Sequence, residues 1–146
     1  MNKLFFIFLS ILLSCGLTKE IEKSDTEIII SLQRTACFGT CPIYKIEISS
    51  DCSGIYTGTK FVKNIGILKF QLETEDVNKI LDYATEINFS TLKDEYSKPI
   101  TDLPTTYIKI KNKNIKDYAG APKELKNLET LIDDLFQKAI KEQTKY

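Results

Sequence analysis

Strict alternation of apolar and polar side chains predicts strands in the first half of the chain. Four segments carry this pattern: residues 26–33, 43–49, 55–62 and 67–72. A period of two puts the apolar side chains on one face of a strand, and in the first segment these are Ile28, Ile30 and Leu32. Turn-forming residues at Asp51–Gly54 and at 63–66 separate the later segments. We therefore expect a four-stranded meander.

The apolar spacing changes to that of a helix at Thr74, whose hydroxyl is placed to act as an N-cap. The apolar stripe of this helix comprises Val77, Ile80, Leu81, Ala84 and Ile87, and the helix is predicted to end near Asn88. A second helix is predicted from Pro122, because proline is favoured at a first helical position. Its stripe comprises Leu125, Leu128, Ile132, Leu135, Phe136 and Ala139.

Two further strands, residues 105–111 and 115–118, are predicted between the helices, with a turn at Asn112–Asn114. Before them, Phe89–Pro104 forms a long connection, which either carries function or covers the surface of the domain. The order of elements, ββββαββα, predicts an α+β fold: an antiparallel sheet of about six strands with both helices packed on one face.

The first 14 residues have the layout of a secretory signal peptide. Lys3 precedes an apolar run, Leu4–Leu13, which is about half the roughly 20 residues needed to span a bilayer. The junction that ends at Ser14 and Cys15 resembles the lipobox at which bacterial signal peptidase cuts before a diacylated cysteine. We therefore expect a signal peptide at 1–14, a lipidated Cys15 with a flexible tether at 15–25, and one globular domain at 26–146, held in the bacterial cell envelope at the outer membrane.

The composition of the chain excludes several classes of function. The 146 residues carry 20 basic and 20 acidic side chains and no histidine, and loss of Lys3 with the leader changes this balance by only one charge. A near-neutral chain with scattered lysines lacks the concentrated basic surface that binding to a nucleic acid requires. The lack of histidine excludes His-based triads and most zinc enzymes. We expect no cofactor, no metal site and no assignable catalytic residue.

Cys37 and Cys41 are expected to form a disulfide, because an exported protein matures in an oxidising compartment and only three residues separate them. A redox-active pair and a metal site are the alternative interpretations. Cys52 is separated from Cys41 by a whole predicted strand, too far for a bridge, and is expected to be a free thiol at a turn.

Three segments of the chain resemble motifs of one known family: Arg34–Tyr44, Thr101–Thr106 and Tyr118–Pro122. The first contains the sequence Cys-Phe-Gly-x-Cys-Pro after Arg-Thr, and the third the sequence Tyr-x-Gly-Ala-Pro. The family is an uncharacterised group of short bacterial lipoproteins known only as a domain of unknown function. The resemblance extends from about Ile28 to Leu135, and it implies a single domain without implying an activity.

These motifs suggest a candidate surface site, comprising Arg34, Phe38, Tyr44, Asp102, Thr105 and Tyr118. Arg34 is the only arginine in the chain, and a planar guanidinium can bind a carboxylate in a way that lysine cannot. We expect Arg34 to bind Asp102 and so to join the loops that follow the first and precede the fifth predicted strand. The alternative is an exposed charge at the end of a strand.

Three functions are consistent with the sequence. The first is a non-catalytic envelope module that binds a protein, a glycan or a small ligand through this candidate site, in addition to its contact with the membrane through the lipid. The second is an enzyme, either a thiol-disulfide oxidoreductase that uses Cys37 and Cys41, or one with an acid–base pair drawn from Asp94, Glu95 and Asp102. The third is a purely structural role in the envelope.

Overall fold

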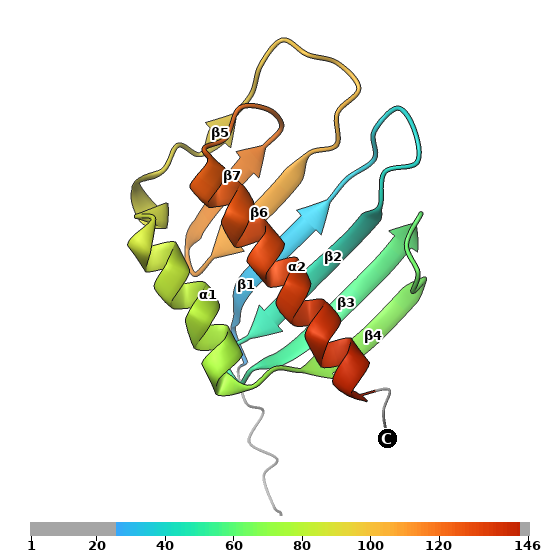
Figure 1. The fold of residues 1–146 in the computed structure, drawn as a ribbon, viewed down its shortest axis with the longest axis vertical. Helices are drawn as coiled ribbons and strands as arrows, with labels where there is room; N and C mark the ends of the chain where they lie inside the picture. Colours follow the sequence, from blue (N-terminus) through green and yellow to red (C-terminus); the bar gives the residue numbers. More distant parts are fainter. Residues whose placement is uncertain (1–25, 144–146) are drawn as a thin grey trace, which may run out of the picture.

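The computed structural model describes residues 26–143, which form one mixed β-sheet covered by two helices (Figure 1). The strands are β1 (Ile28–Arg34), β2 (Ile43–Ser49), β3 (Ser53–Lys60), β4 (Gly66–Gln71), β5 (Glu95–Tyr96), β6 (Thr106–Ile110) and β7 (Lys113–Asp117). The helices are α1 (Thr74–Glu86) and α2 (Lys123–Gln143), with a short 3₁₀ turn, η1 (Phe89–Thr91), after α1. The spatial order of the strands is β4-β3-β2-β1-β6-β7-β5.

The first four strands form the predicted antiparallel meander. Each of these strands pairs with the one that follows it in the chain. Leu32 of β1, for example, lies opposite Ile46 of β2. Strand β6 then inserts on the other side of β1, where Ile108 lies opposite Leu32. Alternate side chains of these strands are buried, since Leu32, Ile46 and Ile108 are at most 1% exposed. One face of the sheet therefore forms one side of the hydrophobic core.

Helix α2 lies diagonally across this face, and α1 packs beside α2 (Figure 1). The predicted stripe of α2 is buried throughout, including Leu125, Leu128 and Ile132 at 0% exposure. Phe136 lies at the centre of an aromatic group: its ring stacks on Tyr56 at a centroid distance of 4.5 Å and meets Phe70 edge-on at 5.2 Å. This aromatic group joins α2 to β3 and β4.

The sheet has one strand more than predicted and is mixed, not purely antiparallel. Strand β5 lies inside the long connection and pairs in parallel with β7, where Tyr96 lies opposite Asp117. The observed element order is therefore ββββαβββα, with the short η1 after α1. A strand of two residues contains no repeat from which a periodicity can be recognised, so the pattern could not predict it.

Three local predictions are wrong for physical reasons. Ile28 is 36% exposed, because a register shift between Ile28 and Ile30 interrupts the alternation of β1. The N-cap of α1 is Glu73, and Thr74 is the first helical residue. The turn between β6 and β7 is shorter than predicted, since Ile110 pairs directly with Lys113.

Several loops meet at one end of the sheet. Because β1 and β3 run toward this end and β2, β4 and β6 run away from it, the connections at 35–42, 61–65 and 97–105 all lie there (Figure 1). The described chain enters β1 at the opposite end. The predicted signal peptide, Cys15 and the tether lie outside the described residues. Among residues 26–143, neither helix combines the length and the apolar composition that a membrane span requires.

The aromatic group around Phe136 gives a test of the core. Phe136 is 2% exposed, so Phe136→Ala is expected to lower the free energy of unfolding by about 3–5 kcal/mol, through lost contacts and the cavity left behind. Gln137→Ala, on the exposed side of the same turn, should change it by less than about 0.5 kcal/mol. Urea unfolding followed by circular dichroism measures both. A loss below about 1 kcal/mol for Phe136→Ala would contradict this packing.

Candidate functional site

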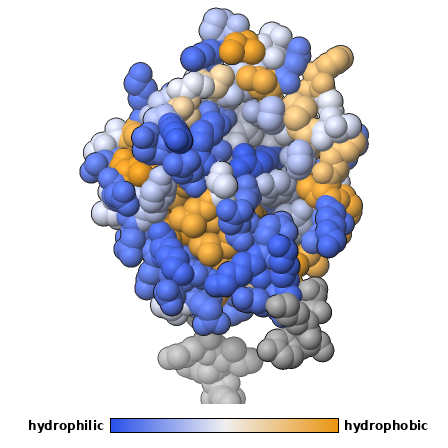
Figure 2. All heavy atoms as spheres, viewed as in Figure 1, coloured by the Kyte–Doolittle hydropathy of each residue, from blue (hydrophilic) through white to orange (hydrophobic). Residues whose placement is uncertain are grey.

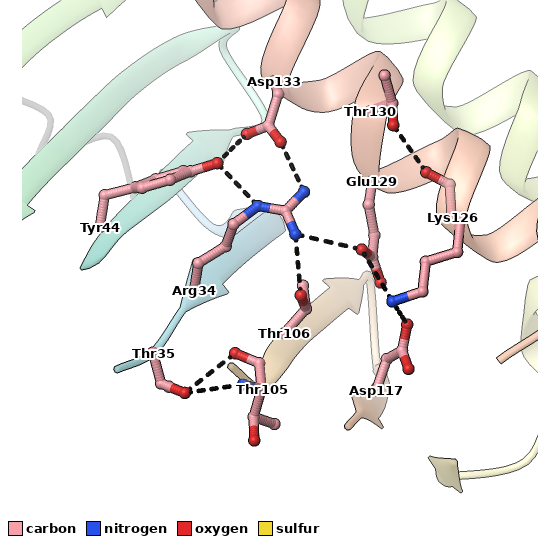
Figure 3. Close-up of polar contacts among 10 residues, drawn as sticks. All are labelled: Arg34, Thr35, Tyr44, Thr105, Thr106, Asp117, Lys126, Glu129, Thr130 and Asp133. Atoms are coloured by element: carbon pink, nitrogen blue, oxygen red, sulfur yellow. Dashed lines mark hydrogen bonds and ion pairs between the residues drawn. The ribbon is translucent and has the colours of Figure 1, made fainter. Parts of the chain in front are cut away.

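The Arg34 guanidinium joins three strands to helix α2 (Figure 3). Its Nε donates to the Tyr44 hydroxyl at 2.8 Å, and its Nη1 donates to Thr106 Oγ1 at 3.0 Å and to Glu129 Oε2 at 3.4 Å. Its Nη2 donates to Asp133 Oδ2 at 2.6 Å, and the Tyr44 hydroxyl donates to Asp133 Oδ1 at 2.7 Å. A single cation thus connects β1, β2, β6 and α2.

Strand parity explains where this side chain points. Ile30, Leu32 and Arg34 occupy alternate positions of β1, so Arg34 faces the helices as the two apolar residues do. Its side chain is 25% exposed, and that of Asp133 is 24% exposed. Charges that are partly removed from water need compensating partners, and each Arg34 nitrogen has at least one.

The same surroundings shift two pKa values. Burial alone would lower the pKa of Arg34, but the adjacent Asp133 carboxylate outweighs it and raises that pKa, so the guanidinium stays charged. Burial raises the pKa of Tyr44, and the hydrogen bond to Asp133 raises it further. Tyr44 therefore stays a neutral donor.

A buried acidic pair adjoins the arginine. Asp117 at the end of β7 and Glu129 on α2 are 1% and 2% exposed, and Lys126 forms ion pairs with both (Figure 3). Burial raises the pKa of Glu129 to about 7; Lys126 and Arg34 oppose this shift, while Asp117 adds to it. Glu129 is therefore protonated over much of the range below neutral pH.

The loops above this cluster are tied to each other. The predicted disulfide between Cys37 and Cys41 is present, with a Cα–Cα distance of 5.7 Å. Backbone bonds then join the loop at 35–42 to that at 97–105: Thr35 N donates to Thr105 O at 3.0 Å, and Phe38 N donates to Asp102 O at 3.4 Å. Cys52 is free, as expected.

Side chains reinforce this link. The Thr35 hydroxyl accepts a hydrogen bond from Thr105 N at 3.0 Å and donates to Thr105 O at 3.2 Å (Figure 3). The Tyr118 hydroxyl donates to Ile100 O at 2.6 Å and so holds the middle of the second loop. The two loops therefore form one braced unit.

Apolar side chains protrude from this unit. Phe38 is 88% exposed at the tip of the disulfide loop, while Ile100 and Leu103 on the neighbouring loop are 48% and 40% exposed. Figure 2 shows apolar residues gathered over this end of the molecule. We call Phe38, Ile100 and Leu103 the apolar tip.

The predicted bond between Arg34 and Asp102 is wrong. The two loops do converge, but through backbone atoms, and the Asp102 carboxylate accepts from the Thr101 hydroxyl at 3.1 Å in an exposed position. Arg34 turns instead toward the helix layer, where Asp133 and Glu129 lie. The six candidate residues are thus divided: Arg34 and Tyr44 act beneath the loops, whereas Phe38, Asp102, Thr105 and Tyr118 belong to the loops or brace them.

The carboxylates considered as an acid–base pair are engaged separately. Asp94 pairs with Lys113, and Glu95 pairs with Lys116 at 3.0 Å. Both lysines belong to β7. Within residues 26–143, no group of three or more cysteine, aspartate or glutamate side chains is placed to hold a metal ion.

Glu129 and Asp133, the carboxylates on α2, are not among the residues predicted for this site. Glu129 lies directly after Leu128 and three residues before Ile132, so it occupies the buried face of α2, and Asp133 follows it by one helical turn. A carboxylate inside an apolar stripe, with a lone arginine on the apolar face of a strand, is the signal that could have identified this pairing.

Comparison with known proteins identifies a family. A family model described as a domain of unknown function, DUF6438, matches residues 28–136. The match runs from β1 into α2 and includes Arg34, both disulfide cysteines, Glu129 and Asp133. No curated protein and no solved structure matches the chain.

The arginine network gives a second test. Arg34→Lys is expected to lower the free energy of unfolding by about 2 kcal/mol, because one ammonium cannot reach partners on β2, β6 and α2 together. Combined with Asp133→Asn in a double-mutant cycle, it should give a coupling above about 1 kcal/mol. The exposed pair Lys116 and Glu95 is the control and should show a much weaker coupling, because solvent screens its charges. Equal coupling in both cycles would contradict the structural role of Arg34.

Glu129 makes stability depend on pH. Because its folded pKa of about 7 lies above the ordinary value of 4.5, its contribution is fully present below pH 4.5 and is lost as the pH rises to 7. We expect a decrease on the order of 2 kcal/mol across this window. Glu129→Gln mimics the neutral acid and should flatten the profile. Urea midpoints measured from pH 4.5 to 8 test this, and an unchanged slope in the variant would contradict the assignment to Glu129.

Proposed function

The chain belongs to the DUF6438 family, and because that family carries no assigned activity, we propose from the protein's own surface that it is a non-catalytic binding module. In this proposal, a lipid on Cys15 holds the module in the bacterial cell envelope, and the apolar tip binds a protein partner. The observation that carries the proposal is the 88% exposure of Phe38 on a loop that is fixed in shape.

An exposed phenylalanine on a rigid loop favours binding for two reasons. A buried aromatic side chain contributes strongly to an interface, and aromatic residues are over-represented among interface anchors. The disulfide between Cys37 and Cys41 and the hydrogen bonds to the neighbouring loop already restrict the backbone. Less conformational entropy is then lost on association, which raises affinity.

The shape of the tip favours a protein partner over a glycan or a small ligand. Small-molecule sites are concave and enclose their ligand, whereas Phe38, Ile100 and Leu103 are exposed side chains on loops at the end of the domain. A protruding apolar group fits an apolar recess on another protein. The proposed partner therefore offers such a recess within reach of the envelope.

The positions of the proposed lipid anchor and of the apolar tip are compatible with binding to a partner. A tether of residues 15–25 could extend roughly 35 Å at ~3.4 Å per residue. The described chain enters the sheet at the end opposite the tip (Figure 1). A module held in this way would direct the tip away from the membrane that holds it.

Lipidation can be tested directly. The protein purified from membranes is expected to have an acylated Cys15 as its first residue, and Cys15→Ser should leave it unprocessed and unacylated. Intact-mass spectrometry with N-terminal peptide mapping distinguishes the two states. A mature N-terminus at any other residue would refute the anchor.

The binding surface can be tested by photo-crosslinking in living cells. A benzoylphenylalanine placed at position 38 is expected to yield one discrete adduct with an envelope protein. Tyr107, 45% exposed on β6, supplies the control position and should yield none. Phe38→Ser should abolish co-purification of the same protein, whereas Tyr107→Ser should not. No adduct from position 38, or the same adduct from position 107, would contradict the proposal.

A further inference from the structure

Strand β4 forms an open edge of the sheet. All six of its residues pair with β3 in an uninterrupted register, from Gly66 opposite Gly58 to Gln71 opposite Ser53. No described strand lies beyond it, so alternate backbone N–H and C=O groups face outward. Proteins commonly protect such edges with proline, a bulge or charged side chains, lysine above all. Here the strand is regular, lacks proline and carries one charge, Lys69.

Apolar side chains gather beside this edge. Ile67, the second residue of β4, is 70% exposed, and Ile55 on β3 is 43% exposed. Since Ile55 lies opposite Lys69 and Thr57 lies opposite Ile67, the two isoleucines are diagonal neighbours on the face of the sheet that the helices leave uncovered. Together they form an apolar strip along the edge.

The strip continues into the turn between β3 and β4. Ile65 and Phe61 in this turn are 65% and 44% exposed. Figure 2 shows apolar residues along the margin of the molecule at this turn. An apolar patch next to unpaired backbone groups is the combination that recruits an added strand.

The charges around the strip indicate what kind of strand it accepts. Lys60, Lys63 and Lys69 are all exposed, and none forms an ion pair with a carboxylate within residues 26–143. The Lys60 ammonium instead lies 4.8 Å from the centre of the Phe61 ring. The edge is therefore positively charged as well as apolar.

This charge argues against a second copy of the chain as the occupant. Antiparallel pairing of two β4 edges would bring like-charged lysines together, and like charges across a pair of strands are destabilising. A segment with acidic side chains would instead find three unpaired cations along the edge. Charge complementarity thus favours a segment of a different protein, with acidic side chains, over a second copy of this chain at the β4 edge.

We infer that β4 takes up an extended segment of a partner protein as an eighth strand, and that this segment alternates apolar and acidic residues. Its main chain bonds to the free N–H and C=O groups of β4. Its apolar side chains pack against Ile67 and Ile55 on the uncovered face, while its carboxylates reach the lysines that flank them. This surface shares no residue with the apolar tip, and the inference does not depend on the proposed function.

A synthetic peptide provides the test. The probe is a fluorescent, terminally blocked peptide of repeating Val-Glu units, eight residues long, titrated against the full-length protein in detergent and followed by anisotropy. Saturable binding is expected. A peptide of the same sequence with N-methyl groups on alternate amides keeps the side chains but loses the edge donors, so it should not bind. A Val-Lys repeat should not bind either.

Matched variants locate the site. Lys69→Glu is expected to weaken binding about tenfold through reversal of one charge, and Ile67→Thr should weaken it as well. Lys109→Glu makes the same charge change on the uncovered face of β6 and should leave binding unchanged. Circular dichroism confirms that each variant is folded.

Three results of the peptide titrations would overturn the inference. They are absence of saturable binding, equal binding of the N-methylated peptide, and equal effects of Lys69→Glu and Lys109→Glu. Sedimentation of the protein without peptide tests the excluded occupant. A dimer that Ile67→Glu dissociates would mean that a second copy occupies the edge, and the proposed partner segment would then be wrong.

Discussion

One half-buried cation, the Arg34 guanidinium, connects the separate parts of this domain. The Arg34 guanidinium bonds to Tyr44 on β2, to Thr106 on β6 and to two carboxylates of α2, so its single planar group connects three adjacent strands to the helix that covers them. Its partners lie up to 99 residues away in the chain. Because one side chain makes all these bonds, the loop end of the sheet and the helix layer cannot shift independently without breaking at least one of them.

The position of this cation determines what the loops can do. Arg34 is the last residue of β1, and the next residue, Thr35, starts the bonds that tie the disulfide loop to its neighbour. The end of β1, the disulfide and the hydrogen bond from Tyr118 to Ile100 therefore all restrict the same pair of loops. A loop that is braced in this way can keep Phe38 in water without collapse onto the domain, which is the physical basis of the proposed binding function.

Periodicity predicted the parts of the fold that repeat, and missed those that do not. The alternation in β2 and the stripe of α2 correctly gave the sheet face and the helix that covers it, because burial in regular elements follows a fixed period. Strand β5 has only two residues and arises from tertiary pairing with β7, so no local pattern indicated it. The turn after Ile110 is shorter than predicted for the same reason, since strand pairing decides where a hairpin closes.

About half of the candidate site could be predicted from the sequence. The lone arginine and the paired cysteines identified the right end of the domain, because both are rare residue types with few structural uses. The expected partner, Asp102, is wrong, because the carboxylates that Arg34 contacts are Glu129 and Asp133 on α2. Glu129 gave the better signal, because a carboxylate at a buried helical position needs a partner.

Amide hydrogen exchange tests most directly whether the arginine network fixes the loops. Tyr44→Phe removes the hydroxyl that bridges Arg34 and Asp133 but keeps the ring in place. The account predicts that exchange of the Thr35 and Thr105 amides, which bond the two loops together, speeds up about tenfold, as expected for about 1.4 kcal/mol of lost local stability. Amides in the ladder between β3 and β4 should keep their rates. Unchanged rates at Thr35 and Thr105, or a uniform acceleration across the whole sheet, would contradict it.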